Sequence, residues 1–149
     1  MKKRIDLSQP GLNACACFNL RKAARSVTQL YDQILQPSGL RATQLSILVG
    51  AYSSESETIS RLAETLVMDR TTLTRDLKPL EREGLVSVVP GEDRRTRVVT
   101  LTKQGRKAVE ESLPLWQKAQ ARVIEGFGED RFHALLSDLS DTVDVTRGE

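Results

Sequence analysis

The stretch of residues 58–102 constrains the fold of this chain more than any other part of its sequence. Within it, apolar residues recur at three- and four-residue spacing over residues 59–66 and again over residues 73–80, which predicts two consecutive helices. Two runs of β-branched residues then enclose a polar loop, which predicts a β-hairpin at about residues 85–101. The predicted order of helix, turn, helix and hairpin is the outline of a winged helix-turn-helix.

The second predicted helix has two opposed faces. Asp69 is a good N-cap and Gly84 is placed to end the helix, so the helix-turn-helix spans about residues 58–83. Because each residue advances a helix by about 100°, three leucines fall within about 60° of one another, and polar side chains occupy the opposite side. The leucines are Leu73, Leu77 and Leu80, and the polar strip is Thr71, Arg75 and Lys78, with Thr74 at its edge. We expect the leucines to pack inward and the strip to face a partner.

The residue types in this strip match the chemistry of double-stranded DNA. Threonines contact base edges, thymine methyl groups or phosphates, and an arginine pairs bidentately with guanine in the major groove. The hairpin tip adds Arg94, Arg95 and Arg97 within four positions, and an arginine on a thin ribbon can enter a narrow minor groove. The combination favours a DNA-reading surface over an ordinary solvated helix face.

The distribution of charge along the chain agrees with a nucleic-acid partner. The 149 residues carry a formal net charge of +2. Residues 1–60 have 7 basic and 4 acidic side chains, residues 61–107 have 11 and 7, and residues 108–149 have 4 and 9, so the three net charges are +3, +4 and −5. Basic side chains are therefore concentrated away from the C-terminal part, as suits a protein that lays one surface on phosphates.

Long amphipathic helices are predicted on both sides of this core. Residues 13–36, 108–127 and 132–143 carry apolar residues at helical spacing. A core of this size has too little surface to bury all three stripes. We therefore expect the terminal helices, at about residues 10–36 and 103–146, to associate across a two-fold axis in a homodimer. An intramolecular bundle is the alternative.

Four stretches of the sequence resemble the MarR-type winged-helix transcriptional regulators, and the resemblance covers nearly the whole chain. They are residues 69–75, 80–86, 93–95 and 101–105. The resemblance implies a mainly α fold with a small β-hairpin wing (α+β), in one domain over residues 1–149. A winged helix-turn-helix core at about residues 41–102 would be flanked by the dimerisation helices.

The resemblance also implies a role for each candidate residue. The helix from Arg70 would enter the major groove of a pseudo-palindromic operator whose half-sites lie about one helical turn apart, and Arg95 would reach the adjacent minor groove. Asp93 would brace the wing against this helix by ion pairing and would contact no base. The residues expected at the DNA are Arg70, Thr71, Thr72, Thr74, Arg75 and Lys78 on the helix, and Arg94, Arg95 and Arg97 on the wing. The implied function is a DNA-binding transcriptional regulator, expected to be a repressor.

Two kinds of regulatory signal are compatible with the sequence. Cys17, followed fourteen residues later by Tyr31, resembles the sensing helix of the organic-hydroperoxide branch of the family, in which a thiolate is oxidised. That branch usually has a second tyrosine where this chain has Arg21. The other option is a small aromatic or amphipathic effector between the DNA-binding lobe and the dimer helices. Cys15 and Cys17 would point about 200° apart on a helix, so we do not expect them to bridge.

Other classes of function find little support in the sequence. His133 is the single histidine, and no cysteine or acid cluster has a metal-ligand spacing with it. No glycine-rich phosphate loop or GxSxG elbow occurs, so we expect no enzyme activity, metal or cofactor. No signal peptide or membrane span is readable, which predicts a cytoplasmic protein without a membrane partner. A winged helix used only for protein–protein contact is the remaining alternative to DNA binding.

Overall fold

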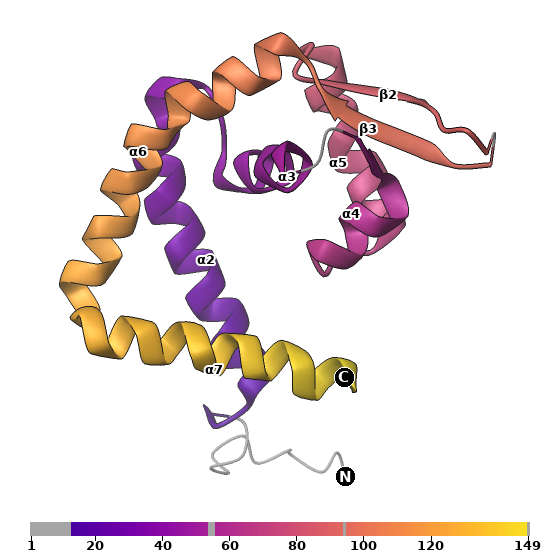
Figure 1. Ribbon diagram of the computed structural model, residues 1–149. Coiled ribbons are helices and arrows are strands. Elements are labelled where there is room, and N and C mark those ends of the chain that lie inside the picture. The colour runs from indigo at the N-terminus through magenta and orange to yellow at the C-terminus, as the bar shows by residue number, and fades with distance from the viewer. Residues whose placement is uncertain (1–12, 54–55, 94, 149) are drawn as a thin grey trace, which may run out of the picture.

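The computed structural model describes residues 13–53, 56–93 and 95–148, and Figure 1 shows the arrangement of its helices and strands. Along this part of the chain the elements are α2 (Ala16–Leu35), the 3-10 helix η1 (Gln36–Ser38), α3 (Ala42–Tyr52), β1 (Glu57–Thr58), α4 (Ile59–Thr65), α5 (Arg70–Arg82), β2 (Val86–Pro90), β3 (Arg97–Leu101), α6 (Lys103–Phe127) and α7 (Glu129–Arg147). This mainly α architecture with a small antiparallel sheet confirms the predicted fold class.

The middle of the chain folds into a lobe around an apolar core, to which Leu35 at the end of α2 also belongs. Side chains from α3, α4, α5 and the sheet form one buried cluster, in which Leu48, Leu73 and Leu80 have no exposed surface. Helices α4 and α5 form the helix-turn-helix, and the β2–β3 hairpin projects away from the lobe as its wing (Figure 1). The apolar spacing that predicted the two helices is thus the spacing of the core contacts.

The sheet has one strand that the sequence pattern did not predict. Its three strands are antiparallel in the order β1-β3-β2. Val88 pairs with Val99 in the predicted hairpin, and Glu57 of β1 pairs with Val99 on the other side. Strand β1 has two residues and no β-branched run, so only its pairing with the distant β3 defines it.

Capping side chains begin α4, α5 and α6. Thr58, Asp69 and Thr102 each accept a hydrogen bond from the backbone N–H three residues further on, at 3.2, 2.9 and 3.0 Å. Each bond satisfies one of the donors that the first turn of a helix leaves without a partner. These caps set where each helix starts.

The first helix begins later than the apolar pattern predicts. Helix α2 starts at Ala16, and Cys15 precedes it with an extended backbone, φ −65° and ψ 118°. The side-chain amide of Asn19 donates to the carbonyls of Asn13 and Cys15, both at 2.9 Å, and so stabilises a non-helical turn before the helix. The predicted start at about residue 13 thus lies three residues before the first residue of α2. The argument that Cys15 and Cys17 point apart on one helix does not apply, although both thiols are free.

Helices α2, α6 and α7 form an arm that extends away from the lobe. Helices α2 and α6 pack along each other, and α6 runs unbroken through Pro114 (Figure 1). Of the described side chains of α7, only Phe132 is buried, whereas Leu136 and Leu139 are 47% and 38% exposed. Within one chain the apolar stripe of α7 therefore stays largely uncovered, which does not match the alternative of an intramolecular bundle.

A close backbone contact joins the arm to the lobe. A Cβ atom on Gly105, in the first turn of α6, would lie 1.9 Å from the carbonyl oxygen of Leu85. The Thr102 hydroxyl donates to the carbonyl of Gly84 at 2.6 Å, and the Thr102 backbone N–H donates to that of Leu85 at 3.1 Å. The start of α6 is thus fixed to the turn that follows α5, and only glycine fits at position 105.

We expect Gly105→Ala to lower the free energy of unfolding by about 3 kcal/mol, because the added methyl group meets a backbone oxygen that has little room to move. Gly126→Ala is the matched control, since it lies in the same helix and nothing lies within 4 Å of its added Cβ. It should leave the stability unchanged or raise it by up to about 1 kcal/mol. Urea unfolding followed by circular dichroism measures both, and equal effects of the two substitutions would contradict the contact at Gly105.

Candidate nucleic-acid interface

One face of α5 gathers the polar side chains that the sequence pattern grouped together. Its three leucines, Leu73, Leu77 and Leu80, are at most 2% exposed and hold the helix on the core. On the opposite side, five exposed residues line one shallow, open depression: Arg70, Thr71, Thr74, Arg75 and Lys78. The helix therefore presents three cations and two hydroxyl groups in a single strip, which we call the α5 strip.

The charged groups of the α5 strip are available to a partner. The charged ends of Arg70 and Lys78 have no hydrogen-bond or ion-pair partner among the described residues. Arg75 Nε lies 3.3 Å from Asp76 Oδ1, but 73% of the Arg75 side chain is exposed. Exposed ion pairs contribute at most about 1 kcal/mol, so a phosphate or a guanine can compete with Asp76 for the guanidinium group.

Thr72 is not part of the strip. It is half-buried, its backbone N–H donates to Asp69 Oδ2 at 2.9 Å, and its hydroxyl donates to the same oxygen at 3.3 Å. Thr72 was predicted to contact DNA together with the residues of the α5 strip. In this structure its polar atoms lie at the N-terminal cap of α5, where both donate to the capping carboxylate.

The tip of the wing is a tight turn organised by Asp93. Its carboxylate accepts a hydrogen bond from the backbone N–H of Arg95 at 3.0 Å. Its carbonyl oxygen accepts from the backbone N–H and from the hydroxyl of Thr96, both at 2.8 Å. The Gly91 N–H donates to the Thr96 carbonyl at 3.0 Å and closes the turn. The side chain of Arg95 remains exposed at the end of this ordered turn.

The support that Asp93 gives to the wing differs from the expected one. No ion pair joins Asp93 to α5 among the described residues. Its carboxylate is engaged instead by the N–H two residues further on, a bond that aspartate side chains favour in turns. A hydrogen bond links the wing to α5: Oε1 of Glu81 accepts from the Val88 N–H at 3.3 Å.

The three wing arginines are not equivalent. Arg97 Nη2 donates to the carbonyl of Val88 at 3.4 Å, across the hairpin, so this side chain also supports the ribbon. Arg95 is exposed at the tip, two residues beyond Asp93. Arg94 lies outside the described residues. Among the arginines that the structure describes, Arg95 is therefore the one best placed to reach beyond the wing.

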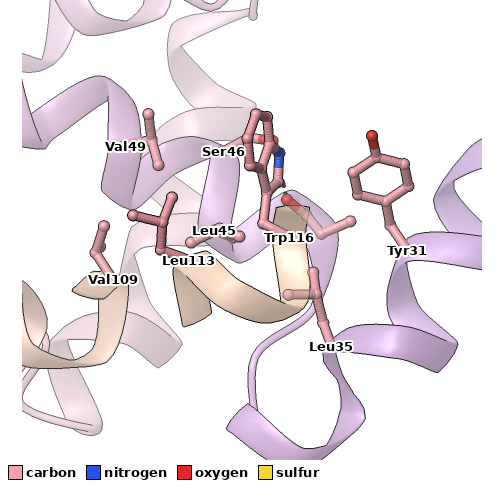
Figure 2. Close-up of a pocket in the computed structure, with 9 residues that line it drawn as sticks. Tyr31, Leu35, Leu45, Ser46, Val49, Val109, Leu113 and Trp116 are labelled. Carbon is pink, nitrogen blue, oxygen red and sulfur yellow. Dashed lines mark hydrogen bonds between the residues drawn. The ribbon is translucent and has the colours of Figure 1, made fainter. Parts of the chain in front are cut away.

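A second candidate site is an apolar cavity between the lobe and the arm. It has a volume of about 300 Å³, and α2, α3 and α6 form its wall (Figure 2). The lining residues are Tyr31, Leu35, Ala42, Leu45, Ser46, Val49, Val109, Leu113 and Trp116. None of them is charged, and their polar side-chain groups are two hydroxyls and one indole N–H. Such a wall suits a mostly apolar ligand that makes a few hydrogen bonds.

Tyr31 lies on the wall of this cavity and also links α2 to α6. Its hydroxyl donates to Gln120 Oε1 at 2.5 Å, and burial raises the pKa of Tyr31 above its ordinary value. Cys17, the other half of the predicted redox pair, is exposed, fourteen residues earlier on the same helix. That separation is about 21 Å along the helix, so the two side chains do not meet within one chain.

Most residues of the cavity were not singled out by their sequence pattern. Val109, Leu113 and Trp116 have the three- and four-residue spacing that assigned them to the apolar stripe of a dimer helix. The spacing cannot tell a stripe that covers another helix from one that lines a cavity. The only feature of the sequence that could have pointed to a cavity here is Trp116, the single tryptophan of the chain.

The last candidate from the sequence is His133. His133 is exposed at the start of α7, with Nδ1 2.8 Å from the carbonyl oxygen of Glu129, one turn earlier. In the part of the chain that the structure describes, no group of histidine, cysteine and acidic residues is arranged to hold a metal ion. None of the described helices has both the length and the apolar character needed to cross a lipid bilayer.

Comparisons with known proteins bear on this arrangement. A sequence model described as the MarR family matches residues 40–96, from the start of α3 to the tip of the wing. The crystal structure of the M. tuberculosis transcriptional regulator MosR in complex with DNA is similar, with a TM-score of 0.79 and 40% sequence identity. The match covers 89% of this chain and 98% of that chain.

Two further relatives are bacterial regulators. The transcriptional activatory protein BadR of Rhodopseudomonas palustris is 31% identical over 132 residues, which cover 85% of this chain and 71% of that protein. The organic hydroperoxide resistance transcriptional regulator of Bacillus subtilis is 29% identical over 100 residues, 66% of this chain and 68% of that protein. The similarity thus extends beyond the lobe into the helices of the arm.

Proposed function

This chain belongs to the MarR family of transcriptional regulators, and we propose that it binds double-stranded DNA as a homodimer and represses transcription from a pseudo-palindromic operator. In the proposed complex, α5 lies in the major groove and the wing lies over the adjacent minor groove. Since the relatives are bacterial and the proposed partner is DNA, the proposed site of action is the cytoplasm.

The observation that carries this proposal is the α5 strip. Three cations and two threonine hydroxyls share one exposed side of a helix whose other side is anchored by buried leucines. The major groove of B-DNA is about 12 Å wide and admits a helix. Arg70 and Lys78 are suited to phosphates, and Arg75, in the middle of the strip, is suited to a guanine. A surface for protein–protein contact alone would more often have an apolar centre.

The proposal of a homodimer rests on the uncovered apolar side chains of the arm. Large hydrophobic residues are exposed on both its first and its last helix: Phe18, Leu20 and Val27 on α2, and Leu136, Leu139 and Val143 on α7. Apolar surface of this extent marks an interaction site. A two-fold axis through the arm would present two α5 strips, which match half-sites about one turn of DNA apart.

We propose that the cavity between lobe and arm binds the effector that releases the protein from DNA. Its volume of about 300 Å³ holds about ten non-hydrogen atoms, given about 30 Å³ for a water-sized group. Because no charged side chain lines it, a buried carboxylate would stay unpaired there, which is costly. The proposed effector is therefore a small, neutral aromatic compound with a hydroxyl group that donates to the Tyr31 oxygen or a carbonyl group that accepts from the Trp116 indole N–H.

Oxidation of Cys17 is the second candidate signal. Its thiol is exposed, and a relative that covers two thirds of this chain is named an organic hydroperoxide resistance regulator. Cys17 lies near the exposed Phe18 and Leu20 of α2, so an oxidised, polar sulfur there would disturb the proposed dimer surface. The α2 residues that line the cavity, Tyr31 and Leu35, lie at the opposite end of the helix from Cys17, so separate variants can test the two signals.

We expect Arg75→Ala to relax the choice of base at one position of each half-site, at a cost of about 1–3 kcal/mol in discrimination. Arg95→Ala should weaken binding more evenly across sequences. It should also reduce the slope of log affinity against log salt concentration by about one, because one phosphate contact is lost. Fluorescence anisotropy on operator DNA selected from random fragments, at several salt concentrations, measures both effects.

Arg131→Ala supplies the control for net charge, because Arg131 is exposed on α7, outside both the α5 strip and the wing. It should leave operator affinity nearly unchanged. Binding that is insensitive to salt and to both arginine substitutions would refute the DNA interface. A reporter gene behind the selected operator should be expressed more strongly without the protein, and weaker expression would identify an activator.

Sedimentation equilibrium at micromolar concentration should give a dimer. Leu139→Asp, which puts a charge into the exposed apolar stripe of α7, should shift the protein toward monomer and lower operator affinity together. Ser137→Asp, at another exposed position of α7, should change neither. A monomeric wild-type protein would rule out the proposed assembly.

Occupancy of the cavity can be followed through Trp116, the only tryptophan. Neutral aromatic compounds of about ten non-hydrogen atoms should change its emission and weaken operator binding, whereas their carboxylate analogues should not. Val49→Phe, which fills the cavity, should abolish both responses. If an organic hydroperoxide releases the DNA instead, and Cys17→Ser but not Cys15→Ser blocks that release, the thiol is the sensor and the effector proposal fails.

A further inference from the structure

The turn between α4 and α5 contains a strained residue. Val67 has a φ of +51° and is the one non-glycine residue with positive φ in the described part of the chain. The left-handed region brings the Cβ atom of an L-residue close to the following carbonyl oxygen, and a β-branched side chain is least suited to it. The cost corresponds to a factor of about ten in the equilibrium between this conformation and an ordinary one.

The hydrogen bonds around Val67 explain which conformation is needed. The Val67 N–H donates to the carbonyl of Glu64 at 3.1 Å, and the Met68 N–H donates to that of Ala63 at 2.8 Å. This is the Schellman pattern that ends many helices, and glycine is the usual residue at the left-handed position. Val67 is 56% exposed, so little burial of its side chain compensates for the strain.

A side chain from the far end of the sequence reaches the same carbonyl. Arg147, the last residue of α7, donates from Nη1 to the carbonyl oxygen of Glu64 at 3.3 Å. It lines one surface depression together with Val67, Met68 and Arg70, the first residue of α5. A cation beside the last carbonyls of a helix is favourable, since those groups carry partial negative charge. Figure 1 shows the C-terminal end of α7 on the side of the molecule that carries α4.

We infer that Arg147 is a positioning residue for the recognition helix. By bonding the Glu64 carbonyl it stabilises the end of α4 in the form that requires Val67 to be left-handed, and so it fixes the direction in which α5 leaves the turn. Strained backbone persists where surrounding contacts over-determine it, and Arg147 supplies such a contact from the arm. The inference rests on the proposed function only where it concerns DNA affinity.

The contact also gives α7 a direct route to the DNA-reading part of the lobe. The close junction at Gly105 joins the arm to the C-terminal side of α5, whereas Arg147 reaches the N-terminal side. A shift of α7 relative to the lobe would break the bond to Glu64 and relax the turn. The arrangement of the arm and the direction of α5 would then be coupled at both ends of that helix.

The first test needs no DNA. In the full chain, Arg147→Ala should speed hydrogen exchange of the Met68 amide about three- to tenfold, as expected for loss of one supporting hydrogen bond. Arg131→Ala, the same loss of charge at the other end of α7, should leave that amide unchanged. Equal protection of Met68 in the Arg147→Ala variant and the wild type would overturn the inference.

The second test is a double-mutant cycle on operator affinity. Arg147→Ala should weaken binding about three- to tenfold, since the turn then populates other conformations. In a Val67→Gly background the same substitution should have little effect, because glycine adopts the left-handed conformation without strain. Val67→Ala is the matched control, since it removes the β-branch but keeps the Cβ atom and should rescue much less.

The possible outcomes separate the inference from other roles of Arg147. Equal losses in the valine and glycine backgrounds would mean that Arg147 acts on DNA by its charge alone, and would overturn the positioning role. Failure of the wild-type protein to bind any DNA would refute the proposed function. The exchange of the Met68 amide would still decide whether Arg147 supports the turn.

Discussion

The contact between the first turn of α6 and the turn after α5 is the constraint on which the arrangement of this protein depends. Two backbones approach so closely at Gly105 and Leu85 that no side chain fits between them. Thr102 bonds both carbonyls of that turn and also caps α6. One short segment therefore ends the wing, starts the long helix of the arm and fixes that helix to the turn after α5. A change in the direction of α6 must move the lobe or break this contact.

The orientation of α5 is set by its buried leucines and by the residues at its start. Leu73 and Leu80 have no exposed surface, so rotating α5 about its axis would withdraw leucine from the core and bury the polar strip. Both changes are costly. Asp69 sets the start of the helix, and the Val67 turn sets its entry angle. The wing is held in turn by Glu81 on α5 and by the hydrogen bonds that Asp93 makes in its own turn.

The apolar cavity lies between the arm and the lobe, where a bound ligand would change their relative position under the proposed function. Its wall combines two helices of the arm with α3, which packs in the lobe (Figure 2). A ligand that filled it would change the spacing of α3 from α2 and α6, while the junction at Gly105 stayed closed. Under the proposed function, the lobe would then rotate about that junction and carry α5 out of register with the second half-site. The same rotation would also affect the hydrogen bond from Arg147 to the Glu64 carbonyl.

The sequence by itself determined the local elements and the chemistry of the α5 strip. Apolar spacing, capping residues and β-branched runs act over a few residues, so the helix-turn-helix, the wing and the faces of α5 were predictable, and the motifs that they carry identified the family.

Other features depend on segments that are distant in the sequence. The strand β1 exists only because it pairs with β3, and the cavity exists only because three helices leave a gap that the spacing of Leu113 and Trp116 does not reveal. Thr72, Asp93 and Cys15 make hydrogen bonds to residues two to four positions away, which the helix and hairpin patterns do not predict. The contacts of Gly105 with Leu85 and of Arg147 with Glu64 were also decided by tertiary structure alone, because long-range packing, unlike helix periodicity, leaves no regular trace in the order of residues.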